Sequence, residues 1–199
     1  MKSLIVLSAP SGAGKTTITR RILDRHPAEV MFSVSATTRA QRPGERDGVD
    51  YYFVTREKFQ DLVREGALIE YEEIFGNFYG TPVSEIERVR QMGKSLLFDI
   101  DVKGGISIRR KFPNDSLLIF IAPPDLAVLE RRLRDRKTEP DETILRRLDR
   151  AEMEMAMADQ YDHIVVNDAL DRAVAEVESF IFHDALPLLV RADTPFNKI

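Results

Sequence analysis

The sequence predicts an α/β fold in which a parallel β-sheet is flanked by helices. Short apolar runs, dense enough to be interior strands, recur along the chain, and a segment with helical periodicity follows most of them. This alternation produces parallel strands joined by crossover helices. A glycine-rich turn separates the first run from the first helical segment. Two stretches interrupt the alternation, one polar and aromatic and one charged and helical. We expect both to be additions to the core sheet.

The first half of the chain begins with a short buried strand from Lys2 to Ser8. The helix after the turn carries Ile18 and Ile22 on one apolar face, at helical spacing. The pattern then predicts, in order, a strand at 31–35, a turn-rich stretch at 37–50, strands at 51–54 and 68–75 on either side of a helix that starts near Arg56, and a helix at 84–92 that ends at Gly93.

In the second half, apolar runs at 96–101, 117–122 and 164–166 predict three more interior strands. The charged helical stretch between them is broken at Glu139-Pro140. A last helix is expected at about 170–190, with Pro187 ending or kinking it.

The two interruptions define the expected division of the chain. The segment from 34 to 82 is polar, aromatic and hairpin-like, which suits a small β-rich insertion. The second insertion is helical and covers 126–160. The remaining parts, 1–33, 83–125 and 161–199, are expected to form the core.

Composition excludes several classes of protein. The chain has 199 residues and a net charge of −4, whereas nucleic-acid binders usually carry a clearly basic domain. It has no cysteine, so disulfides, thiolate nucleophiles and cysteine-bound zinc are excluded. No apolar run approaches the roughly 20 residues that span a bilayer, and the N-terminal run is short for a signal peptide. We expect a cytoplasmic protein that binds neither nucleic acid nor membrane.

Arginine outnumbers lysine by 21 to 8. Arginine is well suited to bidentate contacts with phosphate and carboxylate groups. Genomic base composition can produce the same surplus, so the positions of the arginines must decide between the two explanations. Seven of the 21 fall between Arg131 and Arg150, in the charged helical stretch.

The segment Ala9–Thr16 matches the phosphate-binding pattern G-x-x-x-x-G-K-[ST], except that Ala9 stands where the first glycine usually is. Small residues let backbone N–H groups turn toward phosphate oxygens, and the helix N-terminus adds its positive end. Lys15 would reach the β- and γ-phosphates of a nucleotide, and the Thr16 hydroxyl would bind magnesium. Ala9 is tolerated if its φ is negative, because only left-handed backbone demands glycine.

A second part of a nucleotide site follows at Asp99, where an apolar strand ends in a carboxylate, as the magnesium-binding strand of such proteins does. Asp99 could hold the ion directly or through water. The alternative is that its side chain caps the strand.

The polar insertion carries residues suited to an acceptor. Arg39 and Arg42 are three residues apart in a loop, a spacing that lets both guanidinium groups meet one phosphate; the alternative is that both are solvated loop charges. Tyrosines lie beside turns, where a phenol can reach a phosphate oxygen, although Tyr52 and Phe53 are better explained as core. Glu70, on a predicted strand, could accept two hydrogen bonds from guanine N1–H and N2–H₂. Adenine offers no such pair of donors.

Together these residues resemble the guanylate kinase family over nearly the whole chain, from Leu4 to about Phe182. Two motifs are specific to that family, S-V-S-A-T-T-R-A-Q-R-P-G-E and I-E-Y-E-E-I-F-G-N-F-Y-G-T, whereas the phosphate loop is shared by many NTPases. The other shared motifs are G-V-D-Y-Y-F-V, L-L-F-D-I-D-V-K-G and I-V-V-N-D. The resemblance implies a P-loop NTPase core with an inserted GMP-binding subdomain and a mobile helical lid. It also implies magnesium-dependent transfer of a phosphoryl group from ATP to GMP, with tolerance of dGMP left open.

The resemblance also implies roles for particular residues. The GMP phosphate would be bound by Arg39, Arg42, Tyr51 and Tyr79, and the guanine would be read by Ser35, Glu70, Thr81 and Asp101. The ATP site would comprise Ser11, Gly12, Ala13, Gly14, Lys15, Thr16, Thr17, Arg136 and Asn167. The catalytic set would be Lys15, Arg39, Arg132, Arg136 and Arg147, and Thr16 and Asp99 would hold magnesium.

Two other functions fit parts of the sequence. The first is a non-catalytic, guanylate-kinase-like module that binds protein ligands, but such modules typically degrade the phosphate loop, which is intact here except at Ala9. The second is a relative that phosphorylates a ribose phosphate, which would not need residues that read a base. The retained Ser35, Glu70 and Thr81 argue against it.

Overall fold

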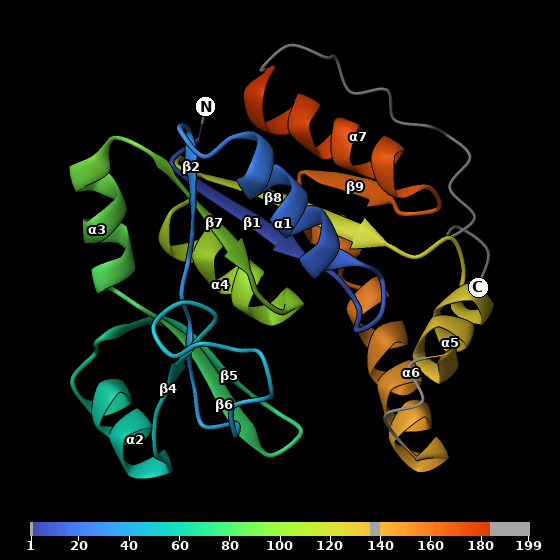
Figure 1. The fold of residues 1–199 in the computed structure, drawn as a ribbon, viewed down its shortest axis with the longest axis horizontal. Helices are drawn as coiled ribbons and strands as arrows, with labels where there is room; N and C mark the ends of the chain where they lie inside the picture. The colour runs from blue at the N-terminus through green and yellow to red at the C-terminus, as the bar shows by residue number, and fades with distance from the viewer. Residues whose placement is uncertain (1, 136–139, 184–199) are drawn as a thin grey trace.

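A computed structural model describes residues 2–135 and 140–183 of the chain. At its centre is a five-stranded sheet whose paired neighbours are all parallel (Figure 1). Its strands, in spatial order, are β2 (Val30–Phe32), β7 (Ser95–Asp99), β1 (Leu4–Ser8), β8 (Ser116–Ala122) and β9 (His163–Val166). The α/β fold with a parallel sheet is therefore confirmed.

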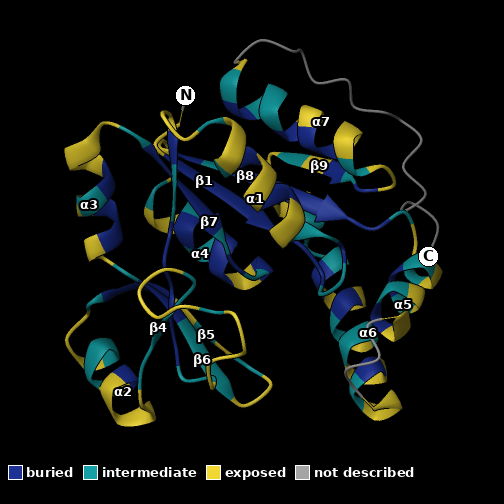
Figure 2. Cartoon of the chain, viewed as in Figure 1, coloured by how far each residue is buried: buried dark blue, intermediate teal, exposed yellow. Residues whose placement is uncertain are grey.

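Helices cover both faces of this sheet, because its apolar side chains alternate between the faces (Figure 2). Ile5 and Leu7 of β1 pack with residues of α1 (Lys15–Arg25) and α7 (Leu170–Phe182). Leu4 and Val6 pack on the opposite face with residues of α3 (Ser84–Met92) and α4 (Val102–Lys111). Strands buried on both faces explain why the sequence shows continuous apolar runs rather than alternation.

The second predicted strand differs from the observed one. The sequence predicts 31–35, whereas β2 ends at Phe32. The backbone N–H of Ser33 still donates to Leu97, but from Ser35 onward the chain joins a second sheet, where the Ser35 carbonyl accepts from Tyr52. Val34 and Ser35 are thus buried between two sheets, which explains an apolar pattern that outlasts the strand.

The second sheet has four strands in the order β4 (Tyr52–Phe53), β3 (Ala36–Thr37), β6 (Asn77–Pro82) and β5 (Leu68–Ile74). β5 and β6 form an antiparallel hairpin. The helix α2 (Arg56–Arg64) packs on this sheet through Phe59, which is buried against Ala36 and Leu68. The inserted β-rich unit expected from the sequence is therefore present.

Two helices, α5 (Leu126–Asp135) and α6 (Asp141–Met155), extend beside the core (Figure 1). They pack on each other through a small apolar cluster that includes Leu129, Leu133 and Ile144. Pro140 precedes α6 with extended backbone, in agreement with the predicted break. The short helix η1 (Ala158–Gln160) then leads into β9.

Some expectations fall outside the described residues. Arg136 is one of them, as are Pro187 and the end of the last predicted helix, which the structure describes only as far as Phe182. Within the described ranges, no helix is long and apolar enough to cross a membrane.

Candidate active site

A cavity of about 340 Å³ opens at the carboxyl ends of β1 and β7, where ligands bind in open α/β sheets. The glycine-rich loop after β1, the end of β7, the β-rich insertion and helix α6 all line it. The cavity thus joins the core to both additions.

The glycine-rich loop has the backbone that its sequence predicts. Gly12 and Gly14 have φ of 99° and 97°, in the left-handed region that favours glycine. Gly14 also has no room for a side chain, since a Cβ there would lie 2.3 Å from Nδ2 of Asn167. Among the described residues Phe75 is the only non-glycine with positive φ, so Ala9 satisfies the condition under which alanine is tolerated.

Lys15 and Thr16 begin helix α1 at the end of this loop, and both contact Asp99. The Lys15 ammonium is ion-paired with Asp99 and donates to the carbonyl of Ile100 at 3.0 Å. The Thr16 hydroxyl donates to Asp99 at 3.1 Å. The Asp99 carboxylate therefore faces the phosphate loop, and these contacts do not support the alternative that it caps its strand.

Glu70 and Thr81 form a buried pair across the β5–β6 hairpin. The Thr81 hydroxyl donates to Glu70 Oε1 at 2.6 Å, and the Glu70 side chain lines the cavity while the residue is only 7% exposed. Burial raises the pKa of Glu70 to about 7, and the charge of Asp101 acts in the same direction, whereas the hydrogen bond from Thr81 opposes the shift. Ser35 lies 3.5 Å from the Thr81 hydroxyl.

Asp101 stands at the N-terminus of α4, where its Oδ1 accepts from the N–H of Gly104 at 2.6 Å. Its other oxygen, Oδ2, accepts from Arg150 at 3.2 Å. Gly104 explains how a second carboxylate fits beside it, since a Cβ at Gly104 would lie 2.8 Å from Oε2 of Glu70. Two carboxylates thus share one end of the cavity.

The loop after β3 carries the two predicted phosphate-binding arginines. Arg39 makes a two-pronged contact with Glu45, at 2.8 and 3.1 Å, and Glu45 also accepts from the backbone N–H of Arg42 at 2.8 Å. Burial disfavours the charged guanidinium, but the hydrogen bonds and charge of Glu45 outweigh it and raise the pKa of Arg39. The Arg39 guanidinium also lies over the ring of Tyr51. The Arg39 guanidinium is therefore held in place, which argues against a free solvated charge at that position, whereas Arg42 is exposed and Glu45 bonds its backbone rather than its guanidinium.

The rings of Tyr51 and Tyr79 meet edge to face, with centroids 6.1 Å apart, and both residues line the cavity. Burial, with the charge of Asp99, raises the pKa of Tyr51 to about 12. The Tyr51 phenol is therefore a neutral hydrogen-bond donor at ordinary pH.

Two arginines of the α5–α6 helices are bonded to the phosphate loop, one directly and one through Asn167. Arg147 donates to the Ser11 hydroxyl at 2.5 Å, and Arg132 donates to the carbonyl of Asn167 at 2.9 Å. Asn167 in turn donates from its side chain to the carbonyl of Ala13 at 2.7 Å. These bonds tie the helical insertion and the end of β9 to the loop.

The structure brings most predicted site residues to one cavity. Those that line it are Ser11, Gly12, Gly14, Lys15, Thr16, Thr17, Ser35, Arg42, Tyr51, Glu70, Tyr79, Asp99, Asp101 and Arg147. Ala13, Arg39, Thr81, Arg132 and Asn167 do not line the cavity. Thr81 is bonded to the lining residue Glu70 and Arg39 lies over the ring of Tyr51, whereas Asn167 is bonded to Ala13 and Arg132 to Asn167.

Sequence reasoning missed Glu72, Phe75, Arg150 and Glu154, which also line the cavity. The spacing of Arg150 and Glu154, four residues apart on a helix, was the available signal.

Within the described residues, no group of three or more His, Cys, Asp or Glu side chains could hold a metal ion by itself.

The fold, the glycine-rich loop and the Lys15–Asp99 pair define a P-loop NTPase-type nucleotide-binding protein. Comparison with known families narrows this class. The family model described as guanylate kinase matches residues 1–184.

Individual relatives agree with the family match. A guanylate kinase of Salinibacter ruber is 53% identical over 176 residues, 88% of this chain and 93% of that protein. A guanylate kinase of Chlorobium chlorochromatii is 52% identical over 178 residues, 89% of this chain and 93% of the relative. The crystal structure of guanylate kinase from Anaplasma phagocytophilum matches with a TM-score of 0.75 and 32% identity, covering 94% of this chain and 88% of that one. The chain belongs to the guanylate kinase family.

Proposed function

We propose that this protein binds ATP on the glycine-rich loop and GMP against the second sheet, and holds the two phosphate groups in line within the shared cavity. As a member of the guanylate kinase family, the chain is an enzyme, a kinase that phosphorylates GMP to GDP with ATP. Phosphoryl transfer needs alignment and neutralisation of charge more than covalent chemistry. The proposal therefore assigns the site residues to those two tasks.

The donor side of the site uses the loop and helix α1. Backbone N–H groups of residues 11–17 would surround the phosphates of ATP, with Lys15 at the β- and γ-phosphates. Arg147 already reaches Ser11 of the loop, so it would meet phosphates bound there. Arg132 would act with it, and Arg136, outside the described residues, is proposed for the same task. Asn167, bonded to the loop at Ala13, would contact the adenine.

The residues beside Lys15 fit a magnesium ion. Thr16 and Asp99 offer a hydroxyl and a carboxylate oxygen within 3.1 Å of each other. Mg²⁺ takes oxygen donors, often only one or two from protein with waters and phosphates completing the set. When bound, the ion would neutralise charge on the phosphates.

The acceptor side has a phosphate end and a base end. Arg39, Arg42, Tyr51 and Tyr79 would bind the phosphate of GMP, since the first two are cations and the phenols are donors beside them. At the base end, Glu70 and Asp101 are acceptors, with Ser35 and Thr81 as hydroxyl neighbours.

The observation that carries the proposal is a pair of carboxylates in the cavity that the phosphate loop also lines: Glu70 is buried, and the side chain of Asp101 is 10% exposed. Two carboxylates repel an anionic acceptor unless it presents hydrogen-bond donors to them. Guanine presents N1–H and N2–H₂ there, and adenine does not.

The test is a coupled assay of ADP release with GMP, AMP and ribose 5-phosphate measured in parallel. We expect turnover of GMP alone. Equal turnover of AMP would show that Glu70 and Asp101 do not read the base, and turnover of ribose 5-phosphate would favour the sugar-phosphate alternative.

Lys15→Met separates the enzyme from a protein-binding module. Removing the ammonium should lower kcat by on the order of 10²–10³-fold or more, because the loop loses its charge at the transferring group. Lys58→Met is the matched control, since Lys58 is exposed on α2, away from the cavity. Circular dichroism should show both variants folded, and an unchanged rate in Lys15→Met would reject catalysis at this loop.

A further inference from the structure

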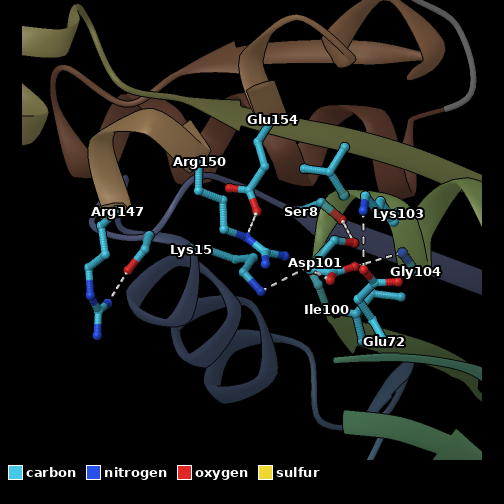
Figure 3. A network of polar contacts seen from close by, with 12 residues as sticks. Ser8, Lys15, Glu72, Ile100, Asp101, Lys103, Gly104, Arg147, Arg150 and Glu154 are labelled. Atoms are coloured by element: carbon cyan, nitrogen blue, oxygen red, sulfur yellow. Dashed lines mark hydrogen bonds and ion pairs between the residues drawn. The ribbon is translucent and has the colours of Figure 1, made fainter. Parts of the chain in front are cut away.

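Arg150 on helix α6 occupies a place in the cavity that none of the assigned residues fills. Its Nε donates to Glu154 at 2.7 Å, and its Nη2 donates to Asp101 at 3.2 Å. Figure 3 shows Arg150 descending from the helix with Glu154 beside it, at the end of the site where Asp101 and Gly104 lie. The guanidinium therefore joins the helical insertion to the start of α4 (Val102–Lys111).

The contact with Glu154 fixes the direction of the Arg150 side chain. Glu154 is four residues further along the same helix, and its side chain is only 9% exposed. The N–H groups of Nε and Nη2 point in fixed directions within the plane of the guanidinium. Because Glu154 takes Nε, the plane of the guanidinium is fixed, and in that plane Nη2 donates to Asp101.

Asp101 is in turn held at both oxygens. Gly104 donates to Oδ1 and Arg150 donates to Oδ2, and the side chain is only 10% exposed. Among the residues that the structure describes, Arg150 is the cation ion-paired with Asp101, whereas Lys15 pairs with Asp99 and Lys103 with Glu72. The orientation of Asp101 thus depends on a residue of the helical insertion.

Phe75 completes the surroundings of Arg150 from the third side. It lies at the turn of the β5–β6 hairpin with φ of 48°, and its ring is within 5.7 Å of the Arg150 guanidinium carbon and 5.6 Å of that of Arg147. Both distances are in the range of cation–π attraction. Arg150 therefore contacts the core, the helical insertion and the acceptor sheet at once.

The charges at this end of the cavity explain why a cation is needed. Glu70, Glu72, Asp101 and Glu154 all line the cavity, and carboxylates this close repel one another. An ion-paired Asp101 keeps its direction, so one oxygen edge stays available to a donor-rich base. Without the arginine, the N–H of Gly104 alone would hold the carboxylate, at Oδ1, and Oδ2 would lose its partner.

We propose that Arg150 is a positioning residue for base recognition: it holds Asp101 as an oriented acceptor and so links the α5–α6 insertion to the guanine end of the site. This inference rests on the proposed role of Asp101 in reading guanine. It assigns Arg150 no contact with a phosphate, which separates it from Arg132 and Arg147 on the same insertion.

The experiment compares Arg150→Gln, Arg150→Lys and Arg146→Gln in steady-state kinetics with GMP and with ATP varied in turn. Arg146→Gln is the matched control, because Arg146 is on the same helix, 62% exposed, and paired only with Glu142 in the described structure. Arg150→Gln should raise the KM for GMP by about 10- to 150-fold, the range for loss of a hydrogen bond to a charged group, with little change in kcat or in the KM for ATP. Arg150→Lys should recover part of the loss.

Asp101→Asn, alone and combined with Arg150→Gln, closes the test as a double-mutant cycle. If Arg150 acts through Asp101, the second substitution adds little to the KM for GMP. Additive effects, a fall in kcat at unchanged KM, or an Arg150→Gln variant that behaves like Arg146→Gln would each overturn the proposal. If Asp101→Asn raises the KM for GMP and Arg150→Gln does not, only the role of Arg150 fails. If Asp101→Asn has no effect, the proposed base-reading role of Asp101 fails, and that of Arg150 with it.

Discussion

Glu70 should make the binding of GMP depend on pH. Burial raises the pKa of Glu70 to about 7, with Asp101 contributing in the same direction. A protonated Glu70 cannot accept both donors of guanine, so only the ionised fraction of the protein is competent to bind. That fraction is about one-tenth at one pH unit below the pKa and about nine-tenths at one unit above it. The KM for GMP should therefore rise about tenfold between these limits on acidification, equivalent to about 1.4 kcal/mol.

Steady-state kinetics with GMP varied, from about pH 6 to 8, is the assay, and Glu70→Gln is the control. The phosphate of GMP also titrates near pH 6, but it does so for both proteins. Division of the wild-type profile by the Glu70→Gln profile leaves the contribution of the carboxyl group. The variant should also bind GMP more weakly at high pH, because an amide presents a donor where guanine needs an acceptor. Identical pH profiles for the two proteins would refute the reasoning.

The same group sets the sign of a stability effect. Because the pKa of Glu70 is raised on folding, the folded protein holds the proton more tightly than the unfolded chain. The contribution of Glu70 to the free energy of unfolding is therefore fully present below its ordinary pKa of 4.5 and is lost as the pH rises through about 7. The loss is on the order of 3 kcal/mol. Urea unfolding of the wild type against Glu70→Gln should show a difference that changes in this direction.

The remaining predictions concern the two loops that would hold phosphate. Gly14→Ala should destabilise the fold and weaken ATP binding, by strain of about 1–2 kcal/mol plus displacement of Asn167, which a Cβ would meet at 2.3 Å. Gly93→Ala, with φ of 65° and open space around it, should show the strain alone, and equal losses in urea unfolding would contradict the packing argument. Glu45→Gln should raise the KM for GMP about 10- to 150-fold and leave that for ATP unchanged, because Glu45 orients Arg39 and accepts from the N–H of Arg42. A lower KM would mean that Glu45 competes with the substrate for Arg39.

Most of the core could be predicted from the sequence, because buried parallel strands need continuous apolar runs. β1, β7 and β8 are such runs, and they begin and end within two residues of the predicted positions. β2 was predicted less well. Val34 and Ser35 are as buried as strand residues, and hydropathy cannot tell burial in one sheet from burial between two.

The features of the site likewise fall into those that local sequence spacing reveals and those that it does not. The phosphate loop could be found from local spacing, since a run of eight residues supplies the whole feature. Local spacing shows the pairing of Arg150 with Glu154 but not its pairing with Asp101, which is 49 positions away. Nor could sequence spacing show that Glu45 holds Arg39, or that Gly104 leaves room for the carboxylate of Glu70. These are relations between elements, and they depend on how the second sheet and α6 meet the core.

The ion pairs of the cavity suggest how binding is organised. Lys15, Arg39 and Arg150 are each paired with a carboxylate of the protein. A buried cation left without a partner is costly, so these pairs stabilise the substrate-free site. An anionic substrate must exchange with the carboxylate at Lys15, and its net gain is the difference between two charged contacts rather than the full strength of one. At Arg150 no exchange is needed, since a neutral guanine edge can share Asp101 with the guanidinium. A phosphate group would then bind by replacing a carboxylate of the protein, whereas the guanine would bind without displacing any group. The base would therefore contribute a large share of the selectivity between substrates, although the phosphates carry most of the charge.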